Sequence, residues 1–294
     1  MTKKTDAIDL TKIKNIQAVN KTEPGFEDRV VRVAEQKKAK EGKFNFSAAE
    51  LIPLPSGGRL YTSVTTDTDI LKGFIRMRPM TIKEEEILST SRFAKTGSTT
   101  RMIIDRCLDS EIDAKDILLY DSNFLLFYLR KISYGDEYQF PLTCGNPVCE
   151  KKFDHKINIS QLQFETLPED FEEPIVVELP KSKYTVKIIL PRLYHSEEIY
   201  MRNMNRKKRS DEEDKRLVDN IIVTTVEIID SEGKTITRGD WEDFLNSLPA
   251  MDRAELTKAT SYTTGVDKLQ DVACPYCGSD FSGTIPIGPE FFRF

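Results

Sequence analysis

Four of the five cysteines stand in two closely spaced pairs, and their spacing is that of metal ligands. Cys144 and Cys149 have four residues between them, in a turn that contains Gly-Asn-Pro, while Cys274 and Cys277 are separated by Pro-Tyr. Two thiolates at such spacing reach one ion, and Gly278 lets the backbone fold back beneath it. Each pair supplies half of a tetrahedron, so the two pairs together predict a single four-cysteine site.

Zinc is the ion that a shell of four thiolates typically holds, at about 2.3 Å from each sulfur. Because four sulfurs leave no position for water, such an ion is structural and does not activate water for hydrolysis. Three alternatives stay open: the reduced cysteines never meet, Cys274 and Cys277 form a redox pair, or His155 replaces one sulfur. The fifth cysteine, Cys107, has no cysteine nearby in the sequence and is expected in the core.

The two pairs lie far apart in the chain, with 124 residues between Cys149 and Cys274. Closing a loop of this length costs roughly 4 to 5 kcal/mol by analogy with disulfides. Structural zinc supplies about 10 to 16 kcal/mol in small peptides, which exceeds that cost. The ion is therefore expected to tie the two ends of one domain together.

Strand-like segments flank both pairs and are expected to position them. Residues 140–158 and 270–286 each predict strand, turn and strand, with the cysteines in the turn and Phe153 or Phe281 after it. Two such hairpins that face each other form a zinc ribbon. A third hairpin is predicted in IVVELPKSKYTVKIILP, because Val, Ile and Tyr alternate on both sides of its turn.

Helical patterns occupy much of the remaining chain. Thr81 stands three residues before Glu84, a capping-box spacing, and a second helix is predicted from Ser98 through MIIDRCL. DILLYDSNFLLFYLRKISYG predicts a helix that is buried on nearly all sides and ends at Gly135. Shorter helices are predicted in HSEEIYMRNMN, RKKRSDEEDKRLVDNIIVTTVEII, WEDFLNSL and PAMDRAELTKATSYTTG. The predicted class is α+β: a helical subdomain plus β-hairpins closed by a four-cysteine zinc ribbon formed from distant parts of the chain.

Residues 1–50 differ from the rest in composition. They hold eleven Lys or Arg against eight Asp or Glu, a local charge of +3, and few large apolar residues before Phe26. FEDRVVRVAEQKKAKEG within this segment has helical character. Such a composition does not build a core, so we expect a charged arm that is partly disordered or becomes ordered on a partner. Residues 51–294 are expected to form one α+β domain that contains both cysteine hairpins.

The overall composition argues against several functional classes. A net charge of −5 and an isoelectric point near 5.4 disfavour a protein that grips a phosphate backbone. No signal peptide or twenty-residue apolar run is present, so we expect no membrane contact and a cytosolic origin with reduced thiols. With two histidines and no Walker A, G-x-G-x-x-G or H-E-x-x-H motif, no enzyme is predicted.

The order of motifs is also informative. EEEIL, an amphipathic helix, LLYDSNFLLFYLRKISYGDEYQFPLTCGNPVC, a distant CPYCGSDF and then IPIGPEFFRF follow one another over about residues 74–294. In this order, and in LRKISYGDEY running directly into the first cysteine pair, the chain resembles the baseplate hub assembly proteins of T-even-type contractile-tailed bacteriophages. CGNPVC is wider than a standard knuckle, and residues 1–50 have no counterpart that we can place in that family.

The resemblance implies a role in tail morphogenesis without an active site. The chain would be a structural or assembly component of the baseplate hub that makes protein–protein contacts. The implied partners are other hub or tail proteins, with the tape-measure protein as one candidate. The implied location is the virion tail baseplate, the host cytoplasm during assembly, or both.

A zinc-ribbon module that binds nucleic acid or takes part in transcription is the second interpretation. Lys151, Lys152, Phe153 and Lys156 beside the first cysteine pair favour it. The acidic overall balance and the lack of any basic residue over 271–290 disfavour it. A metalloenzyme, the third interpretation, would need an open position on the zinc ion.

The aromatic residues near the C-terminal end have two possible uses. Phe291, Phe292 and Phe294 either complete the core of the ribbon or insert into another subunit. Trp241, the only tryptophan, is expected to anchor a short helix in the core.

Overall fold

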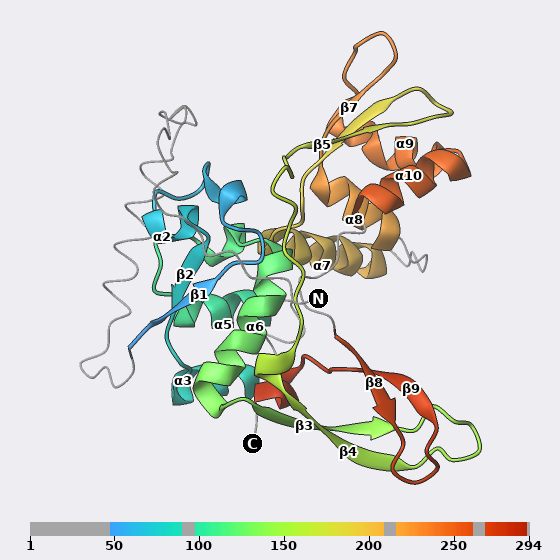
Figure 1. The fold of residues 1–294 in the computed structure, drawn as a ribbon. Coiled ribbons are helices and arrows are strands. Elements are labelled where there is room, and N and C mark those ends of the chain that lie inside the picture. Colours follow the sequence, from blue (N-terminus) through green and yellow to red (C-terminus); the bar gives the residue numbers. More distant parts are fainter. Residues whose placement is uncertain (1–47, 90–97, 209–215, 261–267, 293–294) are drawn as a thin grey trace, which may run out of the picture.

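A computed structural model of the chain describes residues 48–89, 98–208, 216–260 and 268–292 (Figure 1). These residues form helices and small antiparallel sheets, which confirms the predicted α+β class. The predicted charged arm, apart from its last three residues, lies outside the described residues, and so does Phe294.

The strands pair only with antiparallel neighbours. Within the described residues the sheets are β1–β2, β3–β4, β5–β6–β7 and β8–β9. In chain order the helices and strands are β1 (Glu50–Pro53), α2 (Thr68–Leu71), β2 (Phe74–Met77), α3 (Ile82–Ser89), α5 (Thr99–Cys107), α6 (Leu119–Tyr134), β3 (Glu137–Thr143), β4 (Lys152–Asn158), β5 (Ile175–Glu178), β6 (Thr185–Ile188), α7 (Leu193–Lys208), α8 (Arg216–Thr224), β7 (Thr225–Ile229), α9 (Trp241–Ser247), α10 (Ala250–Thr260), β8 (Leu269–Ala273) and β9 (Asp280–Thr284).

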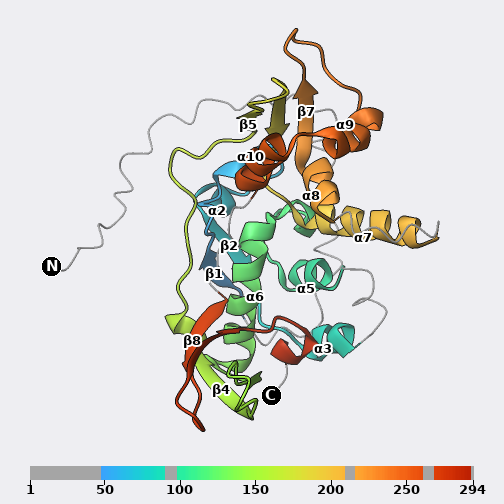
Figure 2. The same cartoon turned by 90° about the vertical axis from the view of Figure 1, so that its right-hand side faces the viewer.

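Helix α6 is the centre of the larger hydrophobic core. Leu125 and Leu129 are completely buried and Phe127 nearly so, as predicted for a helix without a polar face. Helix α5 and the C-terminal 3-10 segment η6 (Pro289–Phe292) pack against it, and Figure 2 shows α6 running through the middle of this part of the molecule. The helix ends at Gly135, whose φ of 90° is accessible to glycine at little cost.

A buried carboxylate fixes the start of α6. Asp121 is completely buried and accepts hydrogen bonds from the Ser56 N–H (2.9 Å), the Ser56 hydroxyl (2.6 Å) and the Tyr61 hydroxyl (2.6 Å). Burial raises the pKa of Asp121 above its ordinary value, and the hydrogen bonds oppose that change. The network joins α6 to the loop that follows β1, and no pattern in the sequence predicted it.

A second, smaller core lies at the other end of the molecule, where α8, α9 and α10 accompany the β5–β6–β7 sheet (Figure 1). Trp241 is buried here, as predicted, and its indole N–H donates to the Ile236 carbonyl at 3.2 Å. The β5–β6 hairpin was predicted, but the pairing of β7 with β6 was not. Because the described residues contain two cores, the single domain expected over residues 51–294 stays a prediction.

Two extended segments, residues 163–174 and 189–192, connect the cores. Arg192 of the second segment forms a largely buried ion pair with Glu173 of the first, at 2.9 Å. His195 is 2% exposed, and its Nδ1 accepts a hydrogen bond from the Arg192 N–H at 2.9 Å. Burial, followed by the charges of Arg192 and Arg238, lowers the pKa of His195 to about 4.

The C-terminal end of the described chain belongs to the larger core. Phe291 is completely buried and Phe292 is 4% exposed, so these two residues complete a core within their own chain. The Phe291 ring packs edge-on against Phe127 and Tyr138, with centroids 5.0 and 4.9 Å away. The Arg130 guanidinium lies 5.7 Å from the same ring.

We expect His195 to make folding stability depend on pH. Its pKa of about 4 in the folded chain lies below the ordinary 6.5, so the unfolded chain binds more protons between these values. Stability should therefore fall as the pH falls from 6.5 to 4, by at most about 3 kcal/mol from this residue. His195→Gln should flatten that part of the profile when denaturant unfolding of the wild type and the variant is compared at each pH. Identical profiles for the wild type and H195Q would contradict the assignment.

Candidate metal centre

The four cysteines of the two predicted hairpins converge at one point. The sulfurs of Cys144 and Cys277 lie 3.7 Å apart, those of Cys149 and Cys274 lie 3.9 Å apart, and all four fall within 4.8 Å of one another. Four sulfurs at about 2.3 Å from a central ion stand about 3.8 Å apart, whereas a disulfide needs about 2.05 Å. The spacing therefore fits a tetrahedral ion, and the cysteines are free thiols.

The first cysteine pair lies in the turn between β3 and β4. The Cys144 N–H donates to the Lys151 carbonyl at 3.0 Å, which closes the hairpin, and the Cys149 N–H donates to the Asn146 carbonyl at 3.0 Å. The Asn146 N–H donates to the Cys144 sulfur at 3.4 Å, and its side-chain oxygen accepts from the Val148 N–H at 2.9 Å. A single asparagine therefore sets the shape of the wide CGNPVC turn.

The second pair lies in the tighter turn between β8 and β9. The Cys274 N–H donates to the Ser279 carbonyl at 3.0 Å, and the Gly278 N–H donates to the Cys274 carbonyl at 2.9 Å. Gly278 has a φ of 72°, a left-handed conformation that favours glycine, as the sequence predicted. Cys274 is buried and Cys277 is exposed, so the site opens to solvent beside Cys277.

Side chains beside the sulfurs hold the two hairpins together. The Asn146 amide donates to the Ser279 hydroxyl across the hairpins at 2.9 Å, and Phe153 packs edge-on against Phe281, with centroids 6.2 Å apart. A Cβ on Gly145 would approach the Phe281 Cβ to 3.1 Å. The hairpins therefore face each other closely at the turns, where the cysteines meet.

The other ends of the hairpins are fixed in the larger core. Tyr138 and Phe140 at the base of β3 are buried and stack with centroids 5.2 Å apart. Ile285, directly after β9, is also buried, and the Tyr138 hydroxyl donates to the Pro286 carbonyl at 3.4 Å. Figure 1 shows both hairpins projecting side by side from this base. We call the paired hairpins, residues 137–158 and 268–284, the clasp.

The thiols differ in acidity because their surroundings differ. Hydrogen bonds from the side chain and the backbone of Ser279 lower the pKa of the Cys277 thiol to about 6. The Cys277 sulfur lies 3.4 Å from the Ser279 hydroxyl oxygen: the thiol donates to this oxygen, and the ionised sulfur instead accepts the hydroxyl proton. Cys107, buried in the larger core, has its pKa raised to about 12 by burial, so it stays a thiol, as its predicted core position implies.

The histidines stand apart from the four sulfurs. His155 packs its ring edge-on against Phe140, with centroids 5.7 Å apart, and is not among the clustered ligands. His195 lies between the two cores, as described above. In the part of the chain that the structure describes, the four cysteines are the one group of three or more clustered Cys, His, Asp or Glu side chains suited to hold a metal.

The fold and the site define the class of protein. It is an α+β protein in which two hairpins, far apart in the sequence, bring four cysteine sulfurs together. None of its described helices is long and apolar enough to cross a membrane. The chain belongs to the T4 bacteriophage base plate protein family, whose family model matches residues 54–293. No curated protein and no solved structure matches the chain.

Family membership confirms the resemblance inferred from the motif order, at the level of a T4-type baseplate protein. It implies a structural component of the virion tail. The match begins earlier than the motifs from which the resemblance was drawn, since it includes the loop after β1, and it leaves residues 1–53 outside.

Two residues near the sulfurs were missed by sequence reasoning. The Gly-Asn-Pro pattern placed Asn146 in the predicted turn, but its hydrogen bonds to Cys144 and Val148 were not predicted. Nothing in the sequence indicates that Asn146 also bonds to Ser279 of the other hairpin, because these residues are 133 positions apart.

Ser279→Ala should make the Cys277 thiol less acidic, because it removes the hydroxyl that hydrogen-bonds to the sulfur. In protein freed of metal, alkylation of Cys277 at pH 7 should slow by on the order of tenfold, since less of the thiol is ionised. Peptide mass spectrometry over time measures the rate. Ser282→Ala, on strand β9 and three residues further along the chain, is the matched control and should leave the rate unchanged. Equal rates for all three proteins would contradict the role of Ser279.

Proposed function

We propose that this protein is a structural or assembly component of the baseplate hub of a contractile-tailed phage, and that it acts by binding other tail proteins. The observation that carries the proposal is the family match over residues 54–293. Other hub or tail proteins are the expected partners, with the tape-measure protein as one candidate. The protein would act in the host cytoplasm during assembly and in the tail baseplate of the virion.

We further propose that Cys144, Cys149, Cys274 and Cys277 hold one structural zinc ion, which makes the clasp a zinc ribbon. The distances between their sulfurs and the all-thiolate donor set support zinc. The ion would join two hairpins that are held otherwise by the Asn146–Ser279 hydrogen bond and by ring contacts. The ion would be structural and would not take part in a reaction, because sulfur occupies all four coordination positions.

A non-enzymatic role follows from the same proposal. A zinc ion with four sulfur ligands has no position for water or substrate. The second histidine, His195, is buried, and its Nδ1 accepts a hydrogen bond from the backbone N–H of Arg192. Protein binding, which requires a rigid surface and no reactive group, is the function that these features support best.

Removing the metal should destabilise the clasp. We expect one zinc per chain by elemental analysis and four sulfurs at about 2.3 Å by X-ray absorption. A chelator at neutral pH should lower the melting temperature by more than about 10 °C, because the ion closes a long loop. Cys107→Ala protein should bind zinc as the wild type does. Purified protein that contains no zinc, or a melting temperature that the chelator does not change, would contradict the zinc proposal.

The hub proposal is tested in phage particles. Complementing phage that lack this protein with the wild type should place the chain in purified baseplates, as detected by mass spectrometry. The Cys149→Ser, Cys274→Ser double variant should be reduced at least about tenfold in those baseplates, because the clasp loses two sulfurs. Cys107→Ala is the matched control and should be retained. The hub role would be contradicted if phage lacking this protein formed normal tails and if no assembly intermediate contained the chain. That outcome would not bear on the zinc proposal.

A further inference from the structure

The turns that carry the cysteines also present apolar side chains to solvent. Val148, in the first turn, is 93% exposed, and Tyr276, in the second, is 58% exposed. The Lys151 ammonium lies 4.8 Å from the centre of the Tyr276 ring, and Lys152 is also exposed. We call Val148, Lys151, Lys152 and Tyr276 the clasp tip.

Folding stability does not account for apolar side chains at these positions, because side chains that are this exposed contribute little to a hydrophobic core. The Asn146–Ser279 hydrogen bond and the Phe153–Phe281 contact hold together the two turns that carry these side chains, so the turn backbones are ordered before a partner binds, which lowers the entropy cost of binding. The same turn exposes Glu150, so Glu150, Lys151 and Lys152 together carry a charge of +1. Apolar groups beside this positive charge fit a surface that offers apolar side chains together with carboxylates.

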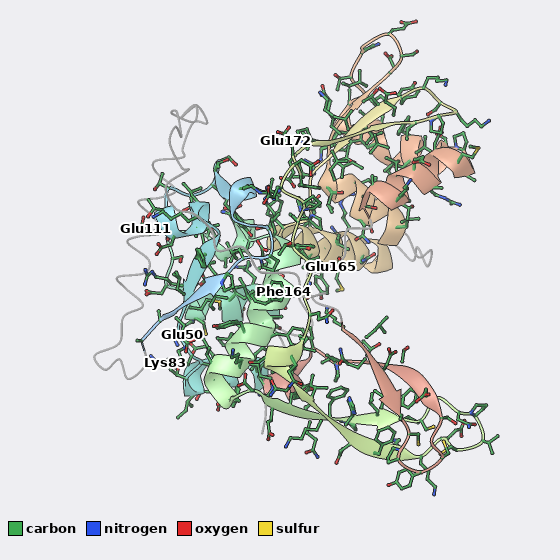
Figure 3. The ribbon with its side chains drawn as sticks, viewed as in Figure 1. Glu50, Lys83, Glu111, Phe164, Glu165 and Glu172 are labelled. Atoms are coloured by element: carbon green, nitrogen blue, oxygen red, sulfur yellow. The ribbon has the colours of Figure 1, made fainter. Side chains whose placement is uncertain are left out.

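A surface with that chemistry lies elsewhere on the same chain. Residues 164–178, which we call the strap, hold six Asp or Glu and no Lys or Arg. Five of these acidic residues are exposed, and so are Phe164 (42%) and Val176 (58%). Figure 3 shows Phe164, Glu165 and Glu172 along the strap as it runs from α6 towards β5.

Within the described part of the chain, Arg59 and Arg192 contact the strap. Arg192 pairs with Glu173, the one acidic residue of the strap that is not exposed. The Arg59 guanidinium donates to the backbone carbonyls of Leu167, at 3.4 Å, and Pro168, at 2.6 Å, rather than to a carboxylate. The strap carries six acidic residues, and these two arginines offset part of their charge.

The strap ends in an open strand edge. Strand β5 pairs with β6 on one side only, and the Leu179 N–H donates to the Tyr184 carbonyl at 2.8 Å. Because bonded residues alternate along an antiparallel strand, the N–H groups of Val176 and Glu178 point away from β6. Among the described residues no backbone carbonyl accepts from them. This edge therefore offers hydrogen-bond donors to a partner backbone, beside the exposed Val176 side chain.

We propose that the clasp tip of one copy docks on the strap of a second copy. The tip supplies apolar groups and lysines, and the strap supplies apolar groups, carboxylates and free N–H groups. In both views the clasp projects away from the strap, so the two surfaces of one copy are separate (Figures 1 and 2). Contacts between two different surfaces repeat head to tail, and they close into a ring when the rotation between neighbours allows it.

Analytical ultracentrifugation of the full chain, with its metal content measured, tests this contact. The wild type should associate reversibly at concentrations up to on the order of 0.1 mM, more weakly as salt is added. The variants K151E/K152E and E169K/E172K should each weaken association about tenfold or more, because like charges then face each other. An equimolar mixture of the two should regain the wild-type strength, since each reversed surface meets its opposite. Tyr276→Ser should weaken association without changing the melting temperature.

Matched charge reversals on other surfaces are the controls. Lys83→Glu on α3 and Glu50→Lys on β1 change exposed residues that Figure 3 labels away from the strap, and they should leave association unchanged. A wild type that stays monomeric over the whole concentration range overturns the proposal. A mixture that associates no better than either variant alone overturns it too, and so does an equal effect of K83E or E50K.

Discussion

The convergence of four sulfurs from two hairpins is the constraint on which the rest of the structure depends. The cysteine pairs are 124 residues apart in the chain, so everything between them must leave the clasp and return to it. The larger core makes this return possible, because Tyr138 on one hairpin and Ile285 after the other are buried in it. The sulfurs then meet within 4.8 Å of one another at the far ends of the hairpins.

Local sequence patterns predicted the structural elements whose formation depends on residues close together in the chain. The two cysteine turns, the β5–β6 hairpin, the buried helix α6 and its end at Gly135 all follow from spacing, alternation or glycine chemistry within short windows. The cysteines were an exception among distant contacts, because four identical ligands of one ion identify one another whatever their separation.

Contacts between distant and chemically ordinary residues were not predictable. Asp121 bonds to Ser56 and Tyr61, and each of these residue types has many other uses in a folded chain. The pairing of β7 with β6 was missed for a related reason, since it depends on where α7 and α8 return the chain. Sequence reasoning found the ligands of the candidate metal centre but not the Asn146–Ser279 bond that aligns them.

The second core lies entirely between the two halves of the four-sulfur cluster, since its buried residues fall between Leu179 and Leu256. The Arg192–Glu173 ion pair joins two of the segments that connect it to the larger core. Loop-closure entropy grows only slowly with the number of residues enclosed. Residues can therefore be added to, removed from or replaced in the second core while the four-sulfur cluster keeps its geometry. The residues of the second core, from Leu179 to Leu256, are where relatives with the same cysteine pairs are free to diverge most in length.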